Sequence, residues 1–184
     1  SDYGASPLQK ITEFFLLEPY GSTISVAAIF FKLKVELQDV LPPDVAIYKG
    51  YNIYFYKLLQ WLCYSLWEVL EIFGYKIIDT EMLTGLPEYR NGGLMVDLGA
   101  LIPRDKKMYE LQHEVSSEFI VEWRAMTIIL LDQIAILIRH KLNKNHIELP
   151  LSKILQGGTW YAGRKIALEL RADGAPPFKI IRNA

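Results

Sequence analysis

The sequence contains a single cysteine, Cys63, in 184 residues. One thiol cannot form an intrachain disulfide or supply the thiolate cluster of a structural zinc site. Because secreted domains often depend on disulfides, this composition indicates a reducing, cytoplasmic compartment. Cys63 stands among apolar residues of a predicted helix, so we interpret it as a buried structural thiol rather than a nucleophile.

Histidine is also scarce, and its spacing does not match a metal site. The three histidines are His113, His140 and His146. None has the i, i+4 partner or the matching cysteines of a zinc site, so we predict solvated surface positions and no metal. The glycine pairs at 92–93 and 157–158 lack the spacing of a phosphate loop or a dinucleotide fingerprint, so we predict no cofactor.

Long apolar runs and an excess of either charge are absent as well. The chain is 51% hydrophobic, but charged residues interrupt every long apolar stretch, so we expect no membrane span. The 20 Lys and Arg residues nearly balance the 21 Asp and Glu residues, which argues against a broad nucleic-acid or anionic-membrane surface. The first residues, SDYGASPLQK, lack the pattern of a secretory signal, so we expect a soluble protein.

What the sequence does contain is apolar residues at three- and four-residue spacing, which predicts helices. The predicted helices span 8–18, 24–40, 54–73, 116–142 and 161–171, with a short helical turn near 148–155. Ser22 or Thr23 is expected to cap the second helix, and Pro19 and Pro42–Pro43 to follow the first two. Short strands are predicted at 77–78 and, from alternation, at 94–98. We therefore predict one mainly helical domain over 1–184 with a few short strands.

A dense polar cluster, Glu88 to Asn91, lies between Pro87 and the glycine pair 92–93 in LTGLPEYRNGGLMVDLGAL. We predict a stiff turn there, because proline fixes the entry and glycine permits unusual backbone angles. The polar residues either cap neighbouring elements or recognise a sugar or a urea-like amide. Both interpretations stay open at this point.

Two other polar groups stand out from apolar surroundings. Glu122 and Arg124 interrupt the oily helix over 116–142, and because unpaired buried charge is costly, they must meet partners or line a cavity. In QGGTWYAGRK a glycine pair precedes a predicted helix start, followed by Arg164 and Lys165. Free amides and cations there suit an anion, although a plain glycine turn is favoured by composition. If the three polar groups converge, they form one pocket.

Four segments in chain order carry a family resemblance. They are KLLQWLCYSLWEVL, LTGLPEYRNGGLMVDLGAL, VEWRAMTIILLD and LPLSKILQGGTWYAGRKIALELRADGAPP. These segments resemble the signature blocks of a family of fungal and bacterial uracil-catabolism proteins, formerly labelled a domain of unknown function. The resemblance covers most of residues 53–177 and implies that this chain is the C-terminal half of a longer family domain.

The resemblance implies a part in pyrimidine breakdown after the ring has been joined to ribose phosphate. A compatible reaction is hydrolysis of the N-glycosidic bond of a ribosylurea-type intermediate, and the implied ligand is a ribosylated or phosphorylated pyrimidine-derived molecule. Such cleavage needs a carboxylate and donors to the leaving amide. The candidate catalytic carboxylates are Glu88, Asp97 and Glu122. The candidate substrate-binding residues are Tyr89, Arg90, Asn91, Arg124, Gln156, Thr159, Trp160, Arg164, Lys57, Gln60 and Trp61.

The sequence departs from the family pattern at two positions. Tyr56 stands where the family has a histidine, and Gln156 stands where it has an acidic residue. A tyrosine of ordinary pKa is a poor base near neutral pH, and a glutamine cannot take a proton. The alternative function is therefore a catalytically degenerate homologue or fragment that binds a ligand or partner.

The aromatic residues around the first segment allow a partner surface. They are Tyr51, Tyr54, Phe55, Tyr56, Trp61, Tyr64 and Trp67. If exposed, they suit docking of a missing N-terminal half. We interpret most of them as core.

Overall fold

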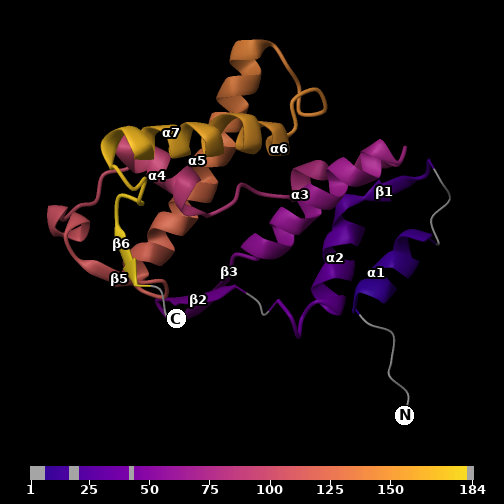
Figure 1. Ribbon diagram of the computed structural model, residues 1–184, viewed down its shortest axis with the longest axis horizontal. Coiled ribbons are helices and arrows are strands. Elements are labelled where there is room, and N and C mark those ends of the chain that lie inside the picture. Colours follow the sequence, from indigo (N-terminus) through magenta and orange to yellow (C-terminus); the bar gives the residue numbers. More distant parts are fainter. Residues whose placement is uncertain (1–6, 17–20, 42–43, 182–184) are drawn as a thin grey trace. The chain divides into compact units, whose positions relative to one another are not determined.

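The computed structural model of the chain describes residues 7–16, 21–41 and 44–181 (Figure 1). It divides the chain into two compact units. Unit 1 comprises Ser1–Asp44 and Tyr56–Leu83, and unit 2 comprises Val45–Phe55 and Thr84–Ala184. Both are mainly helical with short strands, which confirms the predicted fold class. The single-domain assignment stays a prediction.

Unit 1 is built from three helices and a small parallel sheet. Its helices are α1 (Pro7–Leu16), α2 (Val26–Glu36) and α3 (Lys57–Ile72), followed by the short 3₁₀ helix η1 (Thr80–Met82). Strands β1 (Thr23–Ser25) and β4 (Lys76–Ile78) pair in parallel. The strand predicted at 77–78 is thus confirmed. The core of unit 1 combines residues of β1, α2 and α3: Ile24, Val26, Ile29, Leu33, Leu59, Cys63, Tyr64, Trp67 and Leu70.

Helix α2 begins later than predicted because β1 precedes it. The cap is Ser25, whose Oγ accepts a hydrogen bond from the Ala27 N–H at 3.2 Å, rather than Ser22 or Thr23. The backbone of Thr23 instead pairs with Lys76. The helix ends at Glu36 rather than at Val40. Pro19 and Pro42–Pro43 lie outside the described residues.

Helix α3 begins at Lys57 rather than at Tyr54. Tyr56, just before it, has φ 48°. This left-handed conformation belongs to neither a strand nor a right-handed helix, so Tyr56 separates β3 from α3. At the other end Gly74 has φ 86°, and its N–H donates to the Glu71 carbonyl at 2.9 Å. A glycine in this left-handed conformation is common just after the last turn of a helix.

Unit 2 is organised around the long helix α5 (Glu118–Leu142). The other elements are α4 (Tyr89–Asp97), α6 (Leu151–Ile154), η3 (Leu155–Trp160), α7 (Tyr161–Leu170) and the 3₁₀ helix η2 (Lys106–Tyr109). Strands β2 (Val45–Tyr48) and β3 (Tyr51–Tyr54) form an antiparallel hairpin, and β5 (Gln112–Glu114) pairs in parallel with β6 (Lys179–Ile181). Figure 1 shows α7 running beside α4, and α5, which extends above and below them in this view, also contacts α4.

The core of unit 2 lies along α5. Phe178, which precedes β6, is 2% exposed, and its ring meets those of Phe119 and Trp123 edge-on at 4.8 and 4.9 Å between centroids. This helix starts within two residues of its predicted start. Within the described ranges, no helix combines the length and apolar character that crossing a bilayer requires.

The strand predicted at 94–98 is wrong, because these residues continue helix α4. Leu94, Met95 and Val96 are consecutive and all buried, because other elements cover this short helix on several sides. The alternation of apolar and polar residues therefore does not mark a strand here. The predicted stiff turn at Glu88 to Asn91 is wrong for the same reason. Glu88 is the N-cap of α4, and the next three residues form its first turn.

The glycine turn predicted in QGGTW is also wrong. Residues Leu155–Trp160 form a π-helix, and the chain passes from α6 to α7 without reversing. Trp160, before α7, is itself helical, with φ −67° and ψ −46°. Because no new helix starts there, the free amides expected to attract an anion are not provided by a helix start.

His113 is buried rather than solvated. It is 6% exposed, its Nε2 lies 2.8 Å from the Met108 carbonyl oxygen, and its ring stacks at 4.7 Å on Phe119. The cause is the pairing of β5 with β6, which covers this part of the chain. His140 and His146 are exposed, as predicted.

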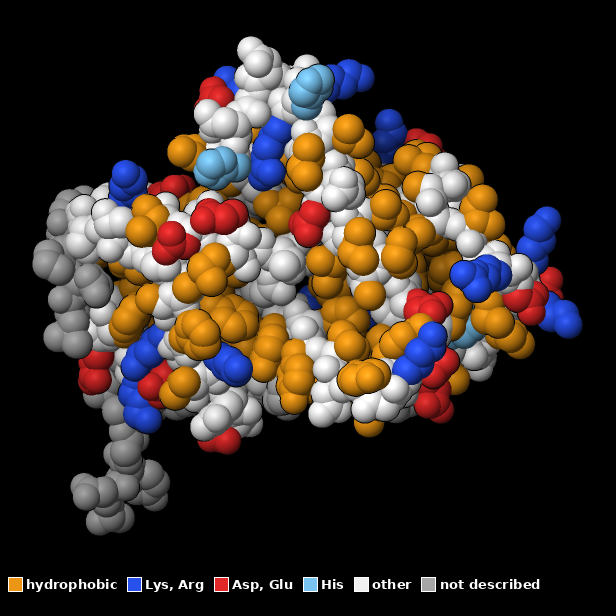
Figure 2. Space-filling view, turned by 180° about the vertical axis from the view of Figure 1, so that it is seen from behind, with side chains coloured by type: hydrophobic (Ala, Val, Ile, Leu, Met, Phe, Trp, Pro, Cys, Tyr) orange, Lys and Arg blue, Asp and Glu red, His pale blue; other side chains and the backbone are white. Residues whose placement is uncertain are grey.

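The aromatic residues of 51–67 divide evenly between core and surface, so the interpretation of most of them as core is only partly right. Phe55, Tyr64 and Trp67 are buried, and Tyr51, Tyr54 and Trp61 are exposed. Tyr56 is intermediate. Exposed hydrophobic side chains are common elsewhere too, as the orange atoms among the charged ones in Figure 2 show.

Cys63 is a structural thiol of the unit 1 core, as predicted. It is fully buried, and burial raises its pKa to about 12. At pH 8 an ordinary thiol is ionised to roughly a quarter, whereas Cys63 in the folded protein holds its proton.

We expect Cys63 in the folded protein to react with a disulfide reagent at pH 8 at least about a hundredfold more slowly than in the urea-unfolded chain. The absorbance of the released thiolate measures both rates. Equal rates would show that the thiol is accessible and ionisable in the folded state.

Candidate functional site

Glu88 is fixed at the start of α4 by its own helix. Its Oε1 accepts a hydrogen bond from the Asn91 N–H at 2.8 Å, and its Oε2 accepts one from the Arg90 N–H at 3.1 Å. These bonds satisfy amides that lack partners at a helix start, and the charge suits the positive end of the helix dipole. The carboxylate is half-buried and held in one orientation.

Asn91 and Thr159 form a buried polar link between α4 and η3. Asn91 is 1% exposed and Thr159 is 4% exposed. Thr159 Oγ1 donates to Asn91 Oδ1 at 2.9 Å, and Asn91 Nδ2 donates to the Leu86 carbonyl at 3.2 Å. Two of the three polar groups singled out in the sequence therefore meet in the fold.

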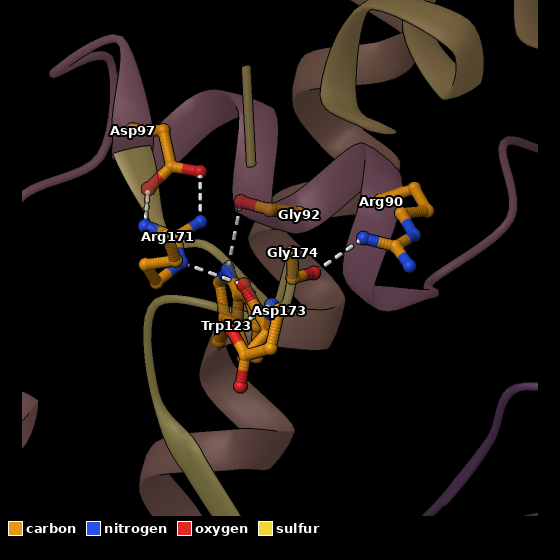
Figure 3. A network of polar contacts seen from close by, with 8 residues as sticks. Arg90, Gly92, Asp97, Trp123, Arg171, Asp173 and Gly174 are labelled. Atoms are coloured by element: carbon orange, nitrogen blue, oxygen red, sulfur yellow. Dashed lines mark hydrogen bonds and ion pairs between the residues drawn. The ribbon is translucent and has the colours of Figure 1, made fainter. Parts of the chain in front are cut away.

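Arg90 anchors the segment that follows α7. Its Nη1 donates to the Gly174 carbonyl oxygen at 2.6 Å (Figure 3). The carbonyl of Arg90 faces α7 at Gly163, where an added Cβ would lie only 2.0 Å from that oxygen. Only glycine permits the two helix backbones to approach this closely.

Asp97 is held by an ion pair at the other end of α4. Its two carboxylate oxygens accept hydrogen bonds from Arg171 Nη1 at 2.9 Å and Nη2 at 2.6 Å (Figure 3). The Asp97 side chain is only 4% exposed. Arg171 also donates through Nε to the Ala175 carbonyl at 2.6 Å. This bidentate pair joins the end of α4 to the segment after α7, which is a structural role.

Helix α5 presents Trp123 and Thr127 to α4. Trp123 Nε1 donates to the Gly92 carbonyl at 3.1 Å (Figure 3), and Thr127 Oγ1 donates to the Trp123 carbonyl at 2.7 Å. A Cβ at Gly92 would lie 2.7 Å from Thr127 Oγ1, so this contact too depends on glycine. Nothing in the sequence indicated Trp123 as a hydrogen-bond donor to α4.

Glu122 and Arg124 both contact the hairpin side of unit 2. Tyr48 in β2 donates its hydroxyl hydrogen to Glu122 Oε1, and the Arg124 guanidinium lies 3.8 Å from the centroid of the Phe55 ring. Side chains next to Trp123 point away from it, since successive helical residues are rotated by about 100°. Glu122 is exposed, contrary to the expected oily surroundings. Both charged groups have partners, but only the half-buried Arg124 is removed from water enough for the cost of unpaired charge to matter.

The remaining candidates in unit 2 reach the surface. Gln156 and Arg164 are exposed, and Tyr89 and Trp160 are 39% and 40% exposed. The Arg164 guanidinium lies 5.9 Å from the centroid of the Trp160 ring. These side chains are available to a ligand.

Three candidates belong to α3 in unit 1. Gln60 is buried, Lys57 is half-buried, and Trp61 is 59% exposed. Their part in a common site stays a prediction.

Sequence reasoning missed Tyr48, Arg171 and Asp132. Tyr48 lies outside every helix and strand predicted from the sequence, although two β-type runs separated by Lys49–Gly50 carry a hairpin signal. Burial raises the pKa of Asp132 on α5, opposed by a hydrogen bond from the Gly85 backbone and by the charge of Arg139. Asp132 is thus a further carboxyl beside the loop that leads to Glu88. Among the described residues, no three His, Cys, Asp or Glu side chains are grouped to hold a metal ion.

We expect the Asp97→Ala substitution to lower the free energy of unfolding by about 2–4 kcal/mol, because Arg171 loses its buried partner. Urea unfolding measures the change. Glu169→Ala, which removes an exposed ion pair with Lys165 on α7, is the matched control and should change stability far less. If Asp97→Ala kept full stability but lost activity, Asp97 would act in the chemistry instead.

The chain matches a family model described as "Protein of unknown function (DUF1688)" over residues 38–184. It is 46% identical over 123 residues to Protein urg3 of Schizosaccharomyces pombe, covering 66% of this chain and 31% of that protein. It is 43% identical over 144 residues to Uracil catabolism protein 4 of Lachancea kluyveri, covering 68% and 32%.

A more distant similarity involves a protein whose name states an activity. The chain is 33% identical over 139 residues to Queuosine 5'-phosphate N-glycosylase/hydrolase of Dictyostelium discoideum, covering 73% of this chain and 40% of that protein. The chain thus spans about a third of the length of the curated relatives it matches first. Since the family model matches well over half of the chain, this protein belongs to the DUF1688 family.

Proposed function

We propose that this chain belongs to a hydrolase of uracil catabolism, one that cleaves the N-glycosidic bond of a ribosylurea-type intermediate. The uracil-catabolism name of one relative supports the pathway, and the N-glycosylase/hydrolase name of another supports the reaction class. The observation that carries the proposal in this chain is the fixed Glu88 carboxylate, next to the buried Asn91–Thr159 link.

The reaction breaks the bond between the anomeric carbon and the urea nitrogen. Positive charge develops on the sugar as the bond breaks, water adds to the anomeric carbon, and the nitrogen gains a proton, so that urea and the ribose derivative are released. A carboxylate held in one orientation stabilises that charge or accepts the proton from water. Glu88 has this orientation before substrate binds, because two backbone amides hold it.

Glu88 is the best of the three candidate carboxylates. Asp97 and Glu88 each accept hydrogen bonds through both carboxylate oxygens, but the Asp97 side chain is only 4% exposed whereas Glu88 is half-buried. Glu122 is exposed and hydrogen-bonded to Tyr48, so water screens its charge more strongly. Asp132, with its raised pKa, suits protonation of the leaving nitrogen better than an ordinary aspartate does.

The exposed side chains near η3 suit the rest of such a substrate. Trp160 offers an aromatic face to a sugar or a planar amide, and Arg164 offers a cation to a phosphate. Gln156 offers an amide that can donate to and accept from a urea group. Tyr89 lies on the first turn of α4, directly after Glu88.

A binding protein without turnover is the second candidate. Each of the three carboxylates predicted from the sequence already has a structural role, which favours binding without turnover. Glu88 caps α4, Asp97 forms an ion pair, and Glu122 accepts a hydrogen bond from the hairpin. Tyr56, where the resemblance implies a histidine, packs edge-on against Phe30 at 5.6 Å between centroids and lies under Lys34. The Tyr56 ring is thus half-buried in contacts within unit 1.

We expect Glu88→Gln to reduce urea release at least about a hundredfold, because the amide can still cap α4 through its oxygen but carries no charge. The assay uses a ribosylurea substrate with this chain, and with a full-length family member carrying the same change. Glu122→Gln, which keeps an acceptor for Tyr48, is the control and should have a much smaller effect.

The same assay separates the two candidate functions. Undiminished turnover in both variants would reject Glu88 and Glu122 as catalytic groups. Thermal stabilisation of the parent by ribose 5-phosphate, uridine or urea without any urea release would favour the binding protein.

A further inference from the structure

The glycine pair Gly157–Gly158 in η3 has no explanation in the described fold. A Cβ added at either position would meet no atom within 4 Å. Neither residue has the positive φ that favours glycine, in contrast to Gly21, Gly50, Gly74, Gly99 and Gly174. Nothing in the described structure therefore demands the absence of a side chain at these two positions.

Other glycines of unit 2 stand at positions where the fold leaves no room for a side chain. A Cβ at Gly163 would lie 2.0 Å from the Arg90 carbonyl oxygen, one at Gly92 would lie 2.7 Å from Thr127 Oγ1, and one at Gly85 would lie 2.7 Å from Leu131. Each of these glycines lets two elements approach closely. Gly157 and Gly158 instead face open space.

Both glycines weaken the helix in which they stand. Glycine is about 1 kcal/mol less favourable than alanine within a helix, and π-helical turns are rare and concentrated at functional sites. Here two glycines and a π-helical turn coincide, and no neighbouring atom requires either residue to lack a side chain. A bare backbone next to open space is what a ligand needs in order to approach the main chain closely.

The surroundings of the pair indicate which ligand fits. Trp160 follows in the same turn with 40% of its surface exposed, and the Arg164 guanidinium is 5.9 Å from its ring centroid. On the inner side, Thr159 is fixed to Asn91, so the turn cannot rotate without breaking a buried hydrogen bond. An aromatic ring, a bare backbone and a cation thus lie together on a rigid surface.

We propose that the backbone of Gly157–Gly158 is the contact surface for the sugar ring of a ribose phosphate, with Trp160 beside the ring and Arg164 at the phosphate. The choice of a ribose phosphate rests on the function proposed above. The role of the glycine pair as a ligand contact rests on the open space and on the lack of any structural demand for glycine. A methyl group at either position occupies the place of the sugar.

The test is a stability measurement paired with a binding measurement on Gly157→Ala and Gly158→Ala. We expect the melting temperature of each variant to be unchanged or a few degrees higher, because the methyl meets open space and alanine favours the helix. We expect the dissociation constant for ribose 5-phosphate, measured by titration calorimetry, to rise at least about tenfold. Gly163→Ala is the control for a glycine that the fold needs, and it should melt several degrees lower.

Two further variants separate the parts of the ligand. Lys153→Ala, on the exposed side of α6, should change neither melting nor binding. Arg164→Gln should weaken ribose 5-phosphate and inorganic phosphate alike, whereas Gly158→Ala should weaken ribose 5-phosphate and leave inorganic phosphate unchanged.

The outcomes distinguish this inference from the proposed function. In one outcome the parent chain binds ribose 5-phosphate and releases no urea, while the alanine variants lose that binding. This result would support the glycine pair as a ligand contact and reject the proposed hydrolase activity. If the alanine variants bind and turn over as the parent does, or melt lower than the parent, that ligand contact is rejected whatever Glu88→Gln shows. Failure of the parent to bind ribose 5-phosphate at millimolar concentration also rejects it.

Discussion

The hydrogen bond from Thr159 to Asn91 is the contact on which the candidate site depends. Both side chains are almost fully buried, so either one left alone would be an unsatisfied polar group in the core. The bond fixes the π-helical turn to the first turn of α4, and the amides of that first turn hold Glu88. A buried polar link therefore sets the position of an accessible carboxylate relative to an exposed aromatic surface. Preorganisation of this kind is what stabilisation of a charged transition state needs.

The rest of unit 2 holds α4 in place from three sides. Arg171 secures its end through Asp97, Trp123 reaches its Gly92 carbonyl from α5, and Arg90 reaches the Gly174 carbonyl after α7. A helix of nine residues is too short to be stable by itself, so these contacts are what make it helical. The same dependence explains why the structural and the functional interpretations of its polar residues are difficult to separate. Residues that shape a site by holding its backbone are polar, buried and paired, as catalytic residues often are.

Features that follow from the spacing of apolar residues were predicted correctly from the sequence. Features that depend on which sides of an element the rest of the chain covers were predicted wrongly. The long helix α5 and the burial of Cys63 follow from local patterns, and both are confirmed. Leu94 to Leu98 looked like a strand because five residues cannot distinguish alternation from a helix that is covered on several sides. The QGGTW stretch looked like a turn because two glycines usually interrupt a helix, whereas the burial of Leu155 and Thr159 against the rest of unit 2 supports a helix there. The Asp97–Arg171 pair joins residues 74 positions apart, a distance at which one sequence offers no pairing signal.

The family match also bears on unit 1, because it begins at residue 38 and so includes α3 but not α2. One face of α3 carries Leu59, Cys63 and Trp67, all buried, and α2 packs on this helix in the present chain. A helix with so apolar a face cannot remain uncovered in water, since each large side chain returned to solvent costs about 1.5–3 kcal/mol. Any family member that keeps the α3 segment must therefore supply a cover, whether or not its sequence resembles α2. The cover can vary while the α3 face stays apolar, which is consistent with a family pattern that starts after α2.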